Sequence, residues 1–533
     1  MSQPIYSTSV QIPMFSGMNQ AGDGYNRNMQ YAREMENVDV TGGGFQPMRE
    51  GVYVTGKLPD IVKPEITTPN HINTLMVLHR QNRLNADVLL VAAGDDGIYT
   101  KTLDGDDEWV DRGGQGGSYD WVTYEVNTYP EYSNTKKYIV GERCIHNDGT
   151  EEEPAYYAYR CTTKIDTAES FNTDHWTSLG DTVGTIDVLL FSNNLGMYCL
   201  YGDEYLDVVP VPTPRNFTVL ARYNERIWGV AANITADTDQ LVYSAPYDPF
   251  DWDQNEEIPE DGAGDILIPT WDGDHFKALK QYGNSLLAIK HHSLWRIYGT
   301  DPGNFNISQQ YGEGTIEENT VAVYNDQAYM LGDNGLLRYD GSAVSPFMQE
   351  ETRELMQLVN AEQRSKCYAA IRGNTYCLAL PINGSTYCNA ILEYNILERT
   401  LSLRTQVDIG GFLNVEDRLL YYNDTKVMEL NDKGTTLPCK WVSCWQDLGL
   451  KNSIKSAFIA YMMVESEAPV ELRVGIRTEK KLKQKTFFTK PGKMTRLHLN
   501  LQGRIFRLEI QSYSAVPFSI SGGIRIDLEL DPD

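Results

Sequence analysis

The sequence predicts an all-β protein: a β-propeller of six or seven blades with an inserted small β-module, an N-terminal arm and a C-terminal β-sandwich. The main observation is a recurring phrase, in which an apolar run, a short polar turn and a second apolar run with an aromatic residue follow one another. This pattern is typical of a β-hairpin. Clear copies span Asp87–Gly105, Asp187–Val209, Asn284–Gly299 and Asp326–Gly341, and weaker copies span Asn374–Asn395 and Asp417–Asp432. Recurrence at roughly 40–55 residues, with four short strands per unit, is typical of propeller blades.

The hairpin phrase assigns residues 61–117 and 182–438 to the propeller. Because repeated blades bury equivalent faces against their neighbours, we expect four tyrosines to occupy comparable positions on equivalent strands. These tyrosines are Tyr99, Tyr201, Tyr298 and Tyr339. The strongest helical pattern in the chain lies inside this region, at Gln349–Lys366.

Both ends of the chain depart from the blade pattern. Residues 1–60 are rich in Gly, Asn and Met, so we expect an extended arm with one short helical stretch near Asn28–Asn37. Residues 439–533 alternate apolar and polar side chains in short runs, which is typical of a small β-sandwich. Residues 118–181 follow a Gly-rich hinge, are rich in Tyr and interrupt the repeat, so we expect a module inserted into a propeller loop.

Charge is distributed unevenly along the chain. The formal net charge is −27, which repels nucleic acid over most of the surface, yet Lys440–Arg507 holds 14 Lys and Arg against 5 Asp and Glu. Within that range, Arg477–Lys493 could contact DNA phosphates, form a solvated hairpin, or pair with an acidic neighbouring subunit. We favour the subunit contact, because a strongly acidic chain needs compensating patches to self-associate. Its expected residues are Lys480, Lys481, Lys483 and Lys485.

The sequence gives little sign of catalysis. It has no GxSxG or HExxH motif, its eight Cys form no CxxC pair, and no apolar segment is long enough to span a membrane. We therefore expect no enzyme, no cofactor, no metal and no membrane span. A scattered pair among the 73 Asp and Glu is the one route that the sequence leaves open to a glycan hydrolase.

The insertion resembles the small carbohydrate-binding modules of bacterial chitinases. The matching positions are Tyr138, Gly141, Cys144 (where Val is usual), Tyr157, Tyr159 and Trp176. The resemblance implies that Tyr138, Tyr157, Tyr159 and Trp176 present flat rings to a cell-surface glycan. The alternative is that these rings form the core of a tiny domain, which needs them. Cys144 and Cys161 flank a predicted hairpin and could face each other.

The rest of the chain resembles the tail nozzle (tail tubular protein B) of short-tailed bacteriophages. The likeness lies in the segment from Phe15 to Gly51 and in Leu241–Asp253. Its matching positions are Gly17, Asn19, Ala32, Asn37, Val38, Gly43, Gly44, Arg49 and Gly51. The resemblance implies a virion protein made in the host cytoplasm, which forms a homo-oligomeric ring, hexameric in this family. Genome DNA would pass through its lumen, and an adaptor and fibres of the tail would be its partners.

The N-terminal arm supplies the remaining assembly residues that we expect. Ile12, Met14, Phe15 and Met18 are apolar enough to bury but have no evident partner, which is typical of a segment that orders on assembly. With Asn19 and Arg49, Phe15 and Met18 are the expected contacts of the arm. Two other function classes remain at this stage: a host-surface glycan-binding propeller and, less favoured, a propeller glycan hydrolase.

Overall fold

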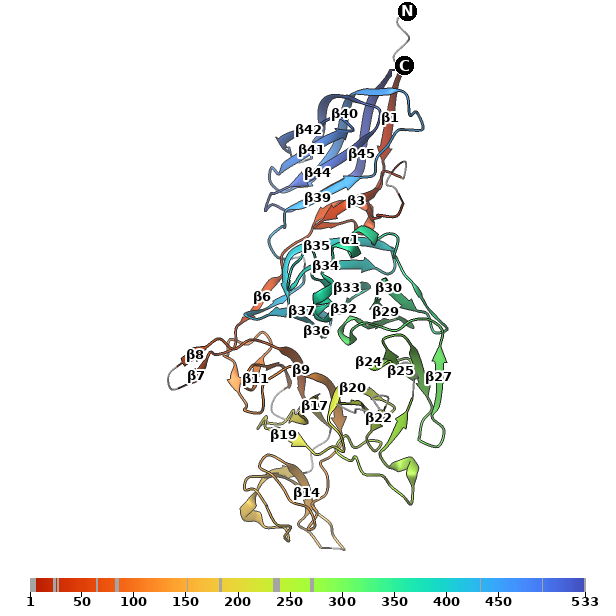
Figure 1. Cartoon of the computed structure of the whole chain (residues 1–533). Coiled ribbons are helices and arrows are strands. Elements are labelled where there is room, and N and C mark those ends of the chain that lie inside the picture. Colours follow the sequence, from red (N-terminus) through yellow and green to blue (C-terminus); the bar gives the residue numbers. More distant parts are fainter. Residues whose placement is uncertain are drawn as a thin grey trace, which may run out of the picture. The chain divides into compact units, whose positions relative to one another are not determined.

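The computed structural model describes residues 6–22, 25, 28–63, 66–81, 86–150, 152–181, 185–232, 240–268, 273–431, 433–490 and 492–531. Nearly all regular structure is strand, which confirms the all-β prediction. The chain divides into two compact units, residues 56–318 and residues 1–55 with 319–533. We describe each unit separately (Figure 1).

The unit of residues 56–318 contains four sheets built on one plan, each with four antiparallel strands. Successive strands pair as neighbours, so each sheet is a meander. The strands are β9 (Thr74–Gln81), β10 (Ala86–Ala93), β11 (Ile98–Thr102) and β12 (Val110–Asp111); β13 (Asp120–Val126), β17 (Ile186–Asn193), β18 (Gly196–Tyr201) and β19 (Val208–Val211); β20 (Phe217–Tyr223), β21 (Arg226–Ala231), β22 (Gln240–Tyr243) and β23 (Gly264–Leu267); and β24 (Phe276–Tyr282), β25 (Ser285–Lys290), β26 (Leu294–Tyr298) and β27 (Asn306–Gln310). A short hairpin, β7 (Ile61–Lys63) and β8 (Ile66–Thr68), precedes them.

The second unit contains three more sheets of the same kind. Their strands are β28 (Ala322–Tyr324), β29 (Gln327–Gly332), β30 (Gly335–Tyr339) and β31 (Val344–Pro346); β32 (Tyr368–Arg372), β33 (Thr375–Leu380), β34 (Cys388–Asn395) and β35 (Thr400–Ile409); and β36 (Gly411–Val415), β37 (Arg418–Asn423), β38 (Lys426–Glu429) and β6 (Val52–Gly56). The last sheet takes its fourth strand, β6, from the N-terminal part of the chain. Over the described residues the two units together hold seven such sheets, a number consistent with the predicted six or seven blades.

The four repeat tyrosines support the blade assignment. Tyr99, Tyr201, Tyr298 and Tyr339 all lie on the third strand of a blade, namely β11, β18, β26 and β30. Three of them end their strand, whereas Tyr99 is the second residue of β11. The prediction of equivalent strands is confirmed, and the prediction of comparable positions is wrong for Tyr99, because its strand begins nearer the aromatic residue.

The inserted module interrupts one blade between its first and second strands. It forms a three-stranded sheet of β14 (Arg143–Asn147), β15 (Tyr156–Cys161) and β16 (Trp176–Asp181), with the short 3-10 helix η2 (Thr173–His175). The expectation that residues 118–181 lie outside the blade is wrong for β13, because Asp120–Val126 pairs with β17 along its whole length. Since Val126 and Ile186 are partners in that pairing, the insertion leaves and re-enters the blade at adjacent points.

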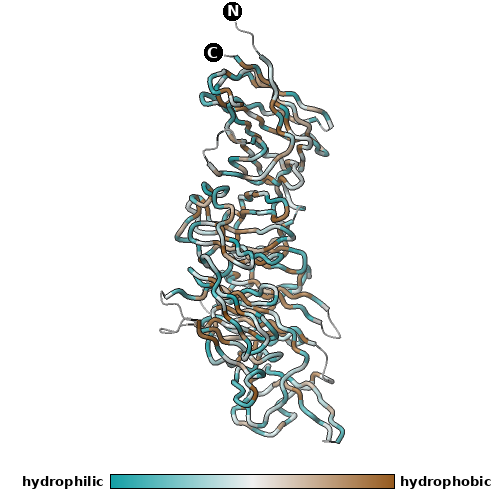
Figure 2. Tube along the Cα trace, turned by 90° about the vertical axis from the view of Figure 1, so that its right-hand side faces the viewer, coloured by the Kyte–Doolittle hydropathy of each residue, from teal (hydrophilic) through white to brown (hydrophobic). Residues whose placement is uncertain are grey.

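The C-terminal strands form a sandwich that includes the N-terminal strands (Figure 1, red beside blue). One sheet has the order β2-β3-β39-β44-β41-β42, and the other has the order β1-β45-β40-β43. The strands are β1 (Tyr6–Ile12), β2 (Ser16–Met18), β3 (Tyr31–Glu36), β39 (Cys439–Ser443), β40 (Ile454–Ser466), β41 (Glu471–Thr478), β42 (Leu482–Phe488), β43 (Met494–Gly503), β44 (Phe506–Ser512) and β45 (Phe518–Asp531). Alternation of hydrophobic and hydrophilic residues along such strands lets each sheet bury one face (Figure 2).

The expectation of an unpartnered arm is therefore wrong. β1 pairs with β45 in the register Tyr6↔Leu530, and β3 pairs with β39. The helical stretch expected near Asn28–Asn37 is also wrong, because most of it is the strand β3. Pairing with strands some 400 positions or more away in sequence overrides a weak local preference.

Helical structure is short. The helical pattern at Gln349–Lys366 yields one short α-helix, α1 (Arg353–Leu358), followed by the 3-10 helix η5 (Ala361–Lys366). Three more 3-10 turns are η1 (Thr41–Gly43), η3 (Pro259–Asp261) and η4 (Glu318–Thr320), and β4 (Val38–Asp39) pairs with β5 (Gln46–Pro47). Among the described residues, none of these helices has the length and apolar character needed to cross a bilayer.

Asn37 joins the N-terminal segment to the rest of its unit. It is 1% exposed and has a left-handed φ of 55°, which Asn tolerates better than most residues. Its side-chain amide donates to Thr405 Oγ1 (3.0 Å) and to the carbonyl of Pro438 (2.8 Å), and its Oδ1 accepts from the Thr405 amide (2.7 Å). Its own backbone amide donates to the Leu403 carbonyl (2.7 Å). One side chain thus ties β35 and the start of the sandwich to the N-terminal segment.

Replacing Asn37 tests this clamp. Asn37→Ala leaves the half-buried Thr405 amide and Pro438 carbonyl without these partners, so we expect the free energy of unfolding to fall by about 2–4 kcal/mol. Denaturant melts followed by circular dichroism measure it. Asn325→Ala is the matched control, because Asn325 is exposed and also has a positive φ (43°); it should cost about 1 kcal/mol or less. Equal losses in the two variants would contradict the clamp.

Candidate functional site: the module junction and the exposed sandwich edge

The aromatic rings expected to bind sugar are mostly inside the module. Tyr138, Tyr159 and Trp176 are 2%, 7% and 5% exposed and form one buried cluster with Cys144, Cys161 and Ile165. The Tyr138 and Trp176 rings meet edge to face at 5.0 Å. Tyr157 is half-buried against the same cluster. The prediction of exposed stacking rings is therefore wrong for three of the four residues, because a three-stranded sheet needs bulky rings to build a core.

The two module cysteines carry free thiols inside this core. Both are fully buried, and burial raises the pKa of Cys161 to about 11 and that of Cys144 still higher. A thiol with a raised pKa holds little of the reactive thiolate at neutral pH. These residues act as small core side chains.

Arg143 of β14 anchors the module to its blade. Its side chain is fully buried, and it makes ion pairs with Asp203 (2.7 Å) and Asp207 (2.8 Å), which follow β18. Its guanidinium also lies over the Tyr201 ring, 4.7 Å from the centroid. Arg160 of β15 binds the same Asp207 at 2.5 and 2.6 Å. Burial opposes ionisation of Asp207, but the bond from Arg160 and the charge of Arg143 outweigh it, so its pKa is lowered.

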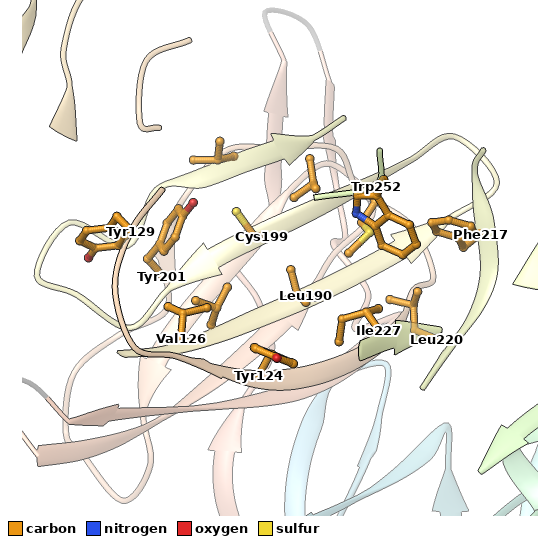
Figure 3. Close-up of a cluster of buried hydrophobic side chains, with 14 of the residues drawn as sticks. Tyr124, Val126, Tyr129, Leu190, Cys199, Tyr201, Phe217, Leu220, Ile227 and Trp252 are labelled. Carbon is orange, nitrogen blue, oxygen red and sulfur yellow. The ribbon is translucent and has the colours of Figure 1, made fainter. Parts of the chain in front are cut away.

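The module and the blade also share an apolar core. Ile145 and Ala158 of the module belong to the same buried cluster as Tyr124, Leu190 and Tyr201 of the blade. Figure 3 shows part of this cluster, with Tyr129 of the insertion beside Tyr201 and with Trp252 beside Phe217 of the next blade. The module thus has its own sheet and its own buried cluster, and one of its faces also packs into the core of the blade. Its folding apart from the blade stays a prediction.

A cleft of about 500 Å³ opens beside this junction. Its walls come from the module, from β18 and β19 with the residues that follow, and from the loop after β22. The lining includes Lys136, Glu142, Pro212, Phe250, Asp251 and Trp252. Lys136 and Glu142 pair with each other at 3.0 Å, so part of the polar rim is already satisfied within the module.

Replacing Arg143 tests the anchor. Arg143→Met leaves Asp203 buried without its cation, and we expect about 3–5 kcal/mol of lost stability, seen first as faster proteolysis of the module. Lys164→Met is the control, because it removes an exposed pair with Asp166 and should change nothing measurable. Because the Asp207 pKa is lowered on folding, its contribution is present above the unfolded value of about 4 and is lost as the pH falls below it. Module cleavage that stays flat down to pH 3 would contradict this account.

A second charged cluster lies in the same unit and has no sequence motif. Asp120 at the start of β13 shares a hydrogen bond with Glu318, and Lys280 of β24 lies 3.4 Å from Glu318 Oε1. Burial and the Asp120 charge raise the pKa of Glu318 well above its usual value, and burial also raises that of Asp120. Both shifts favour the neutral form of the two carboxyl groups, while the Lys280 cation opposes them.

This carboxyl pair does not fit a glycan hydrolase. The two acids of a glycosidase stand roughly 5–9.5 Å apart, so that a sugar carbon or a water fits between them. Asp120 and Glu318 bond directly, and the Leu220 amide also donates to Asp120. The pair is better explained as a structural link that joins β13 and β20 to Glu318.

The raised pKa values of these two carboxyl groups give the stability of this unit a pH dependence. A carboxyl whose pKa is raised on folding loses stability as the pH rises from its unfolded pKa, about 4.3 for Glu, through its folded pKa. We expect Glu318→Gln, which is permanently neutral, to flatten the fall in melting temperature between pH 5 and pH 8. Glu313→Gln is the control at an exposed position. A wild-type melting temperature that rises over this range would contradict a raised pKa of Glu318.

The residues expected to anchor the arm are placed within the chain itself. Phe15 and Met18 are 1% and 4% exposed, and the Phe15 ring meets Phe45 and Trp441 edge to face at 5.4 and 5.2 Å. The Asn19 side chain accepts from the Ala21 amide, and the Arg49 carbonyl accepts from Arg404. The expectation that Phe15 and Met18 contact another protein is wrong, because their side chains fill this unit's own core.

The four predicted assembly lysines lie together on the surface. Lys480, Lys481, Lys483 and Lys485 are all exposed, in and just before β42. Among the described strands, β42 pairs only with β41, so it is the edge of its sheet. Phe488, at the end of β42, is 68% exposed. The structure therefore leaves this strand open to a partner.

Comparisons with known proteins give no family. No family model and no curated protein matches the sequence. Solved structures with similarity include the AfRom2 CNH domain (TM-score 0.30, 9% identity, 72% of this chain and 99% of that chain) and the Pan2 WD40 domain of Neurospora crassa (0.28, 9%, 57% and 98%). An exo-beta-1,3-galactanase of Phanerochaete chrysosporium matches with a TM-score of 0.21 and 8% identity, over 76% of this chain and 100% of that chain. TM-scores this low carry no argument about function.

Proposed function

We propose that this chain is a structural protein of a bacteriophage tail, which assembles into a ring that lets the genome pass and anchors other tail proteins. The proposal rests on the likeness to tail nozzles and on one observation, the exposed basic edge strand β42 in a chain of net charge −27. Such an edge suits association with acidic copies of the same chain. By its resemblance the ring is hexameric, and an adaptor and fibres are its partners in the virion.

The charge of the rest of the chain suits a DNA conduit. Most of the 73 acids lie outside the basic C-terminal range, and like charge keeps a sliding polyanion from being captured. The glycan-binding alternative has less support, because Tyr138, Tyr159 and Trp176 are buried.

The mass of the purified chain tests this proposal. We expect mass photometry at low salt to give a particle of about six times the 60.3 kDa chain, with negative-stain images showing rings. Added salt should shift the population toward single chains, because exposed charge pairs are screened over about 10 Å at 0.1 M. A single chain at every concentration and salt level would contradict the proposal.

A further inference from the structure

The edge of the sandwich at β42 is strongly basic and incompletely covered. Residues 480–493 contain six lysines and no acid. Lysines alone are a common protection of an edge strand against unwanted pairing. Here, however, exposed apolar side chains accompany them: Phe488 and Met494, at the two ends of the turn that joins β42 to β43, are each 68% exposed. An apolar group framed by charges is the usual composition of a protein contact rather than of a protected edge.

A segment of the propeller has the opposite character. The loop from Asp251 to Asp265 contains seven acids and no Lys or Arg, and all seven acids are exposed. It leads into β23, which among the described strands pairs only with β22 and is the outer edge of its blade. Two apolar side chains of the segment are exposed, Ile258 at 49% and Leu267 at 51%.

The acidic loop is held in shape from beneath. Arg226 is 1% exposed, and its guanidinium donates to the carbonyls of Ser244 (2.8 Å), Gly262 (2.6 Å) and Glu260 (2.5 Å). Asn255 Oδ1 accepts from the amides of Glu257 and Ile258, both at 3.0 Å. Since Arg226 bonds the backbone, the loop is fixed while its carboxylates stay on the surface. A segment fixed in this way loses little conformational entropy on binding.

We propose that, in the ring proposed above, β42 of one copy docks on the acidic outer blade edge, residues 251–267, of a neighbouring copy. The inference rests on the proposed function and names the two surfaces of the subunit contact. Six lysines meet seven carboxylates, and each surface offers an open strand edge with exposed apolar side chains. Strand edges that pair across chains supply backbone hydrogen bonds, while complementary charge sets the register and speeds association.

Charge exchange between the two surfaces tests the contact. One variant carries Lys480→Glu, Lys481→Glu, Lys483→Glu and Lys485→Glu; the other carries Glu256→Lys, Glu257→Lys, Glu260→Lys and Asp261→Lys. For each variant alone, we expect the fraction of ring-sized particles in mass photometry to fall at least tenfold, while the circular dichroism spectrum stays that of the wild type. Mixed in equal amounts, they should form rings again, because each contact in an alternating ring then joins opposite charges. A single chain carrying all eight substitutions should also form rings.

A charge-matched control and the remaining outcomes keep the inference separate from the proposed function. The control reverses four exposed lysines elsewhere to Glu, at Lys57, Lys63, Lys164 and Lys426, and should leave the ring intact. A wild type that never exceeds one chain mass overturns the proposed function itself. If the wild type forms rings and either charge variant alone forms them equally well, only the proposed contact is overturned. The same holds if the two variants form no rings when they are mixed. The β42 variant could instead form intact rings that, unlike the wild type, no longer shift a 30-base-pair DNA duplex on a gel. That result assigns the lysines to DNA binding and also overturns the proposed contact.

Discussion

The unit that contains both chain ends depends on the place of Asn37. Its side chain and backbone bond Leu403, Thr405 and Pro438, which belong to the sixth blade and to the approach to the sandwich. Around it, β1 and β3 complete the two sheets of the sandwich and β6 completes the last blade. Two glycines of the nozzle-like motif serve the same packing, since a Cβ on Gly17 would clash with the Leu401 backbone and one on Gly51 with the Tyr421 ring. The N-terminal segment is therefore an integral part of this unit.

Charge serves two separate purposes in this chain. Inside, cations are paired with acids or bond backbone carbonyls: Arg143 holds the module, and Arg226 holds the acidic loop. Breaking such a buried set is costly, because the group left behind has lost its water. On the surface, by contrast, charges of one sign gather in different places, on β42 and on residues 251–265. Surface charge contributes little to folding but guides association.

The blades could be predicted from sequence because their strands are local. Each hairpin consists of consecutive residues, so the strands that hold Tyr201, Tyr298 and Tyr339 could be predicted from the local sequence alone. The N-terminal strands could not be found in this way, since Tyr6 pairs with Leu530 and no local pattern records that partner. The sequence predicts which aromatic residues lie in the module. It does not distinguish a ring that faces a sugar from a ring that faces the core, because both occur on strands. The Asp120–Glu318 pair was missed because two acids far apart in sequence form no motif.

The central claim is that the N-terminal segment is folded into its unit before assembly, whereas the β42 edge of the sandwich gains a partner only on assembly. Hydrogen exchange on the assembled and the salt-dissociated chain tests this claim most directly. Peptides covering residues 31–48 should be protected equally in both states, because their amides bond within the chain. Peptides covering β42 should gain protection only in the assembled state, when its open edge finds a strand. Protection of residues 31–48 that appears only on assembly, with β42 unchanged, would contradict the account.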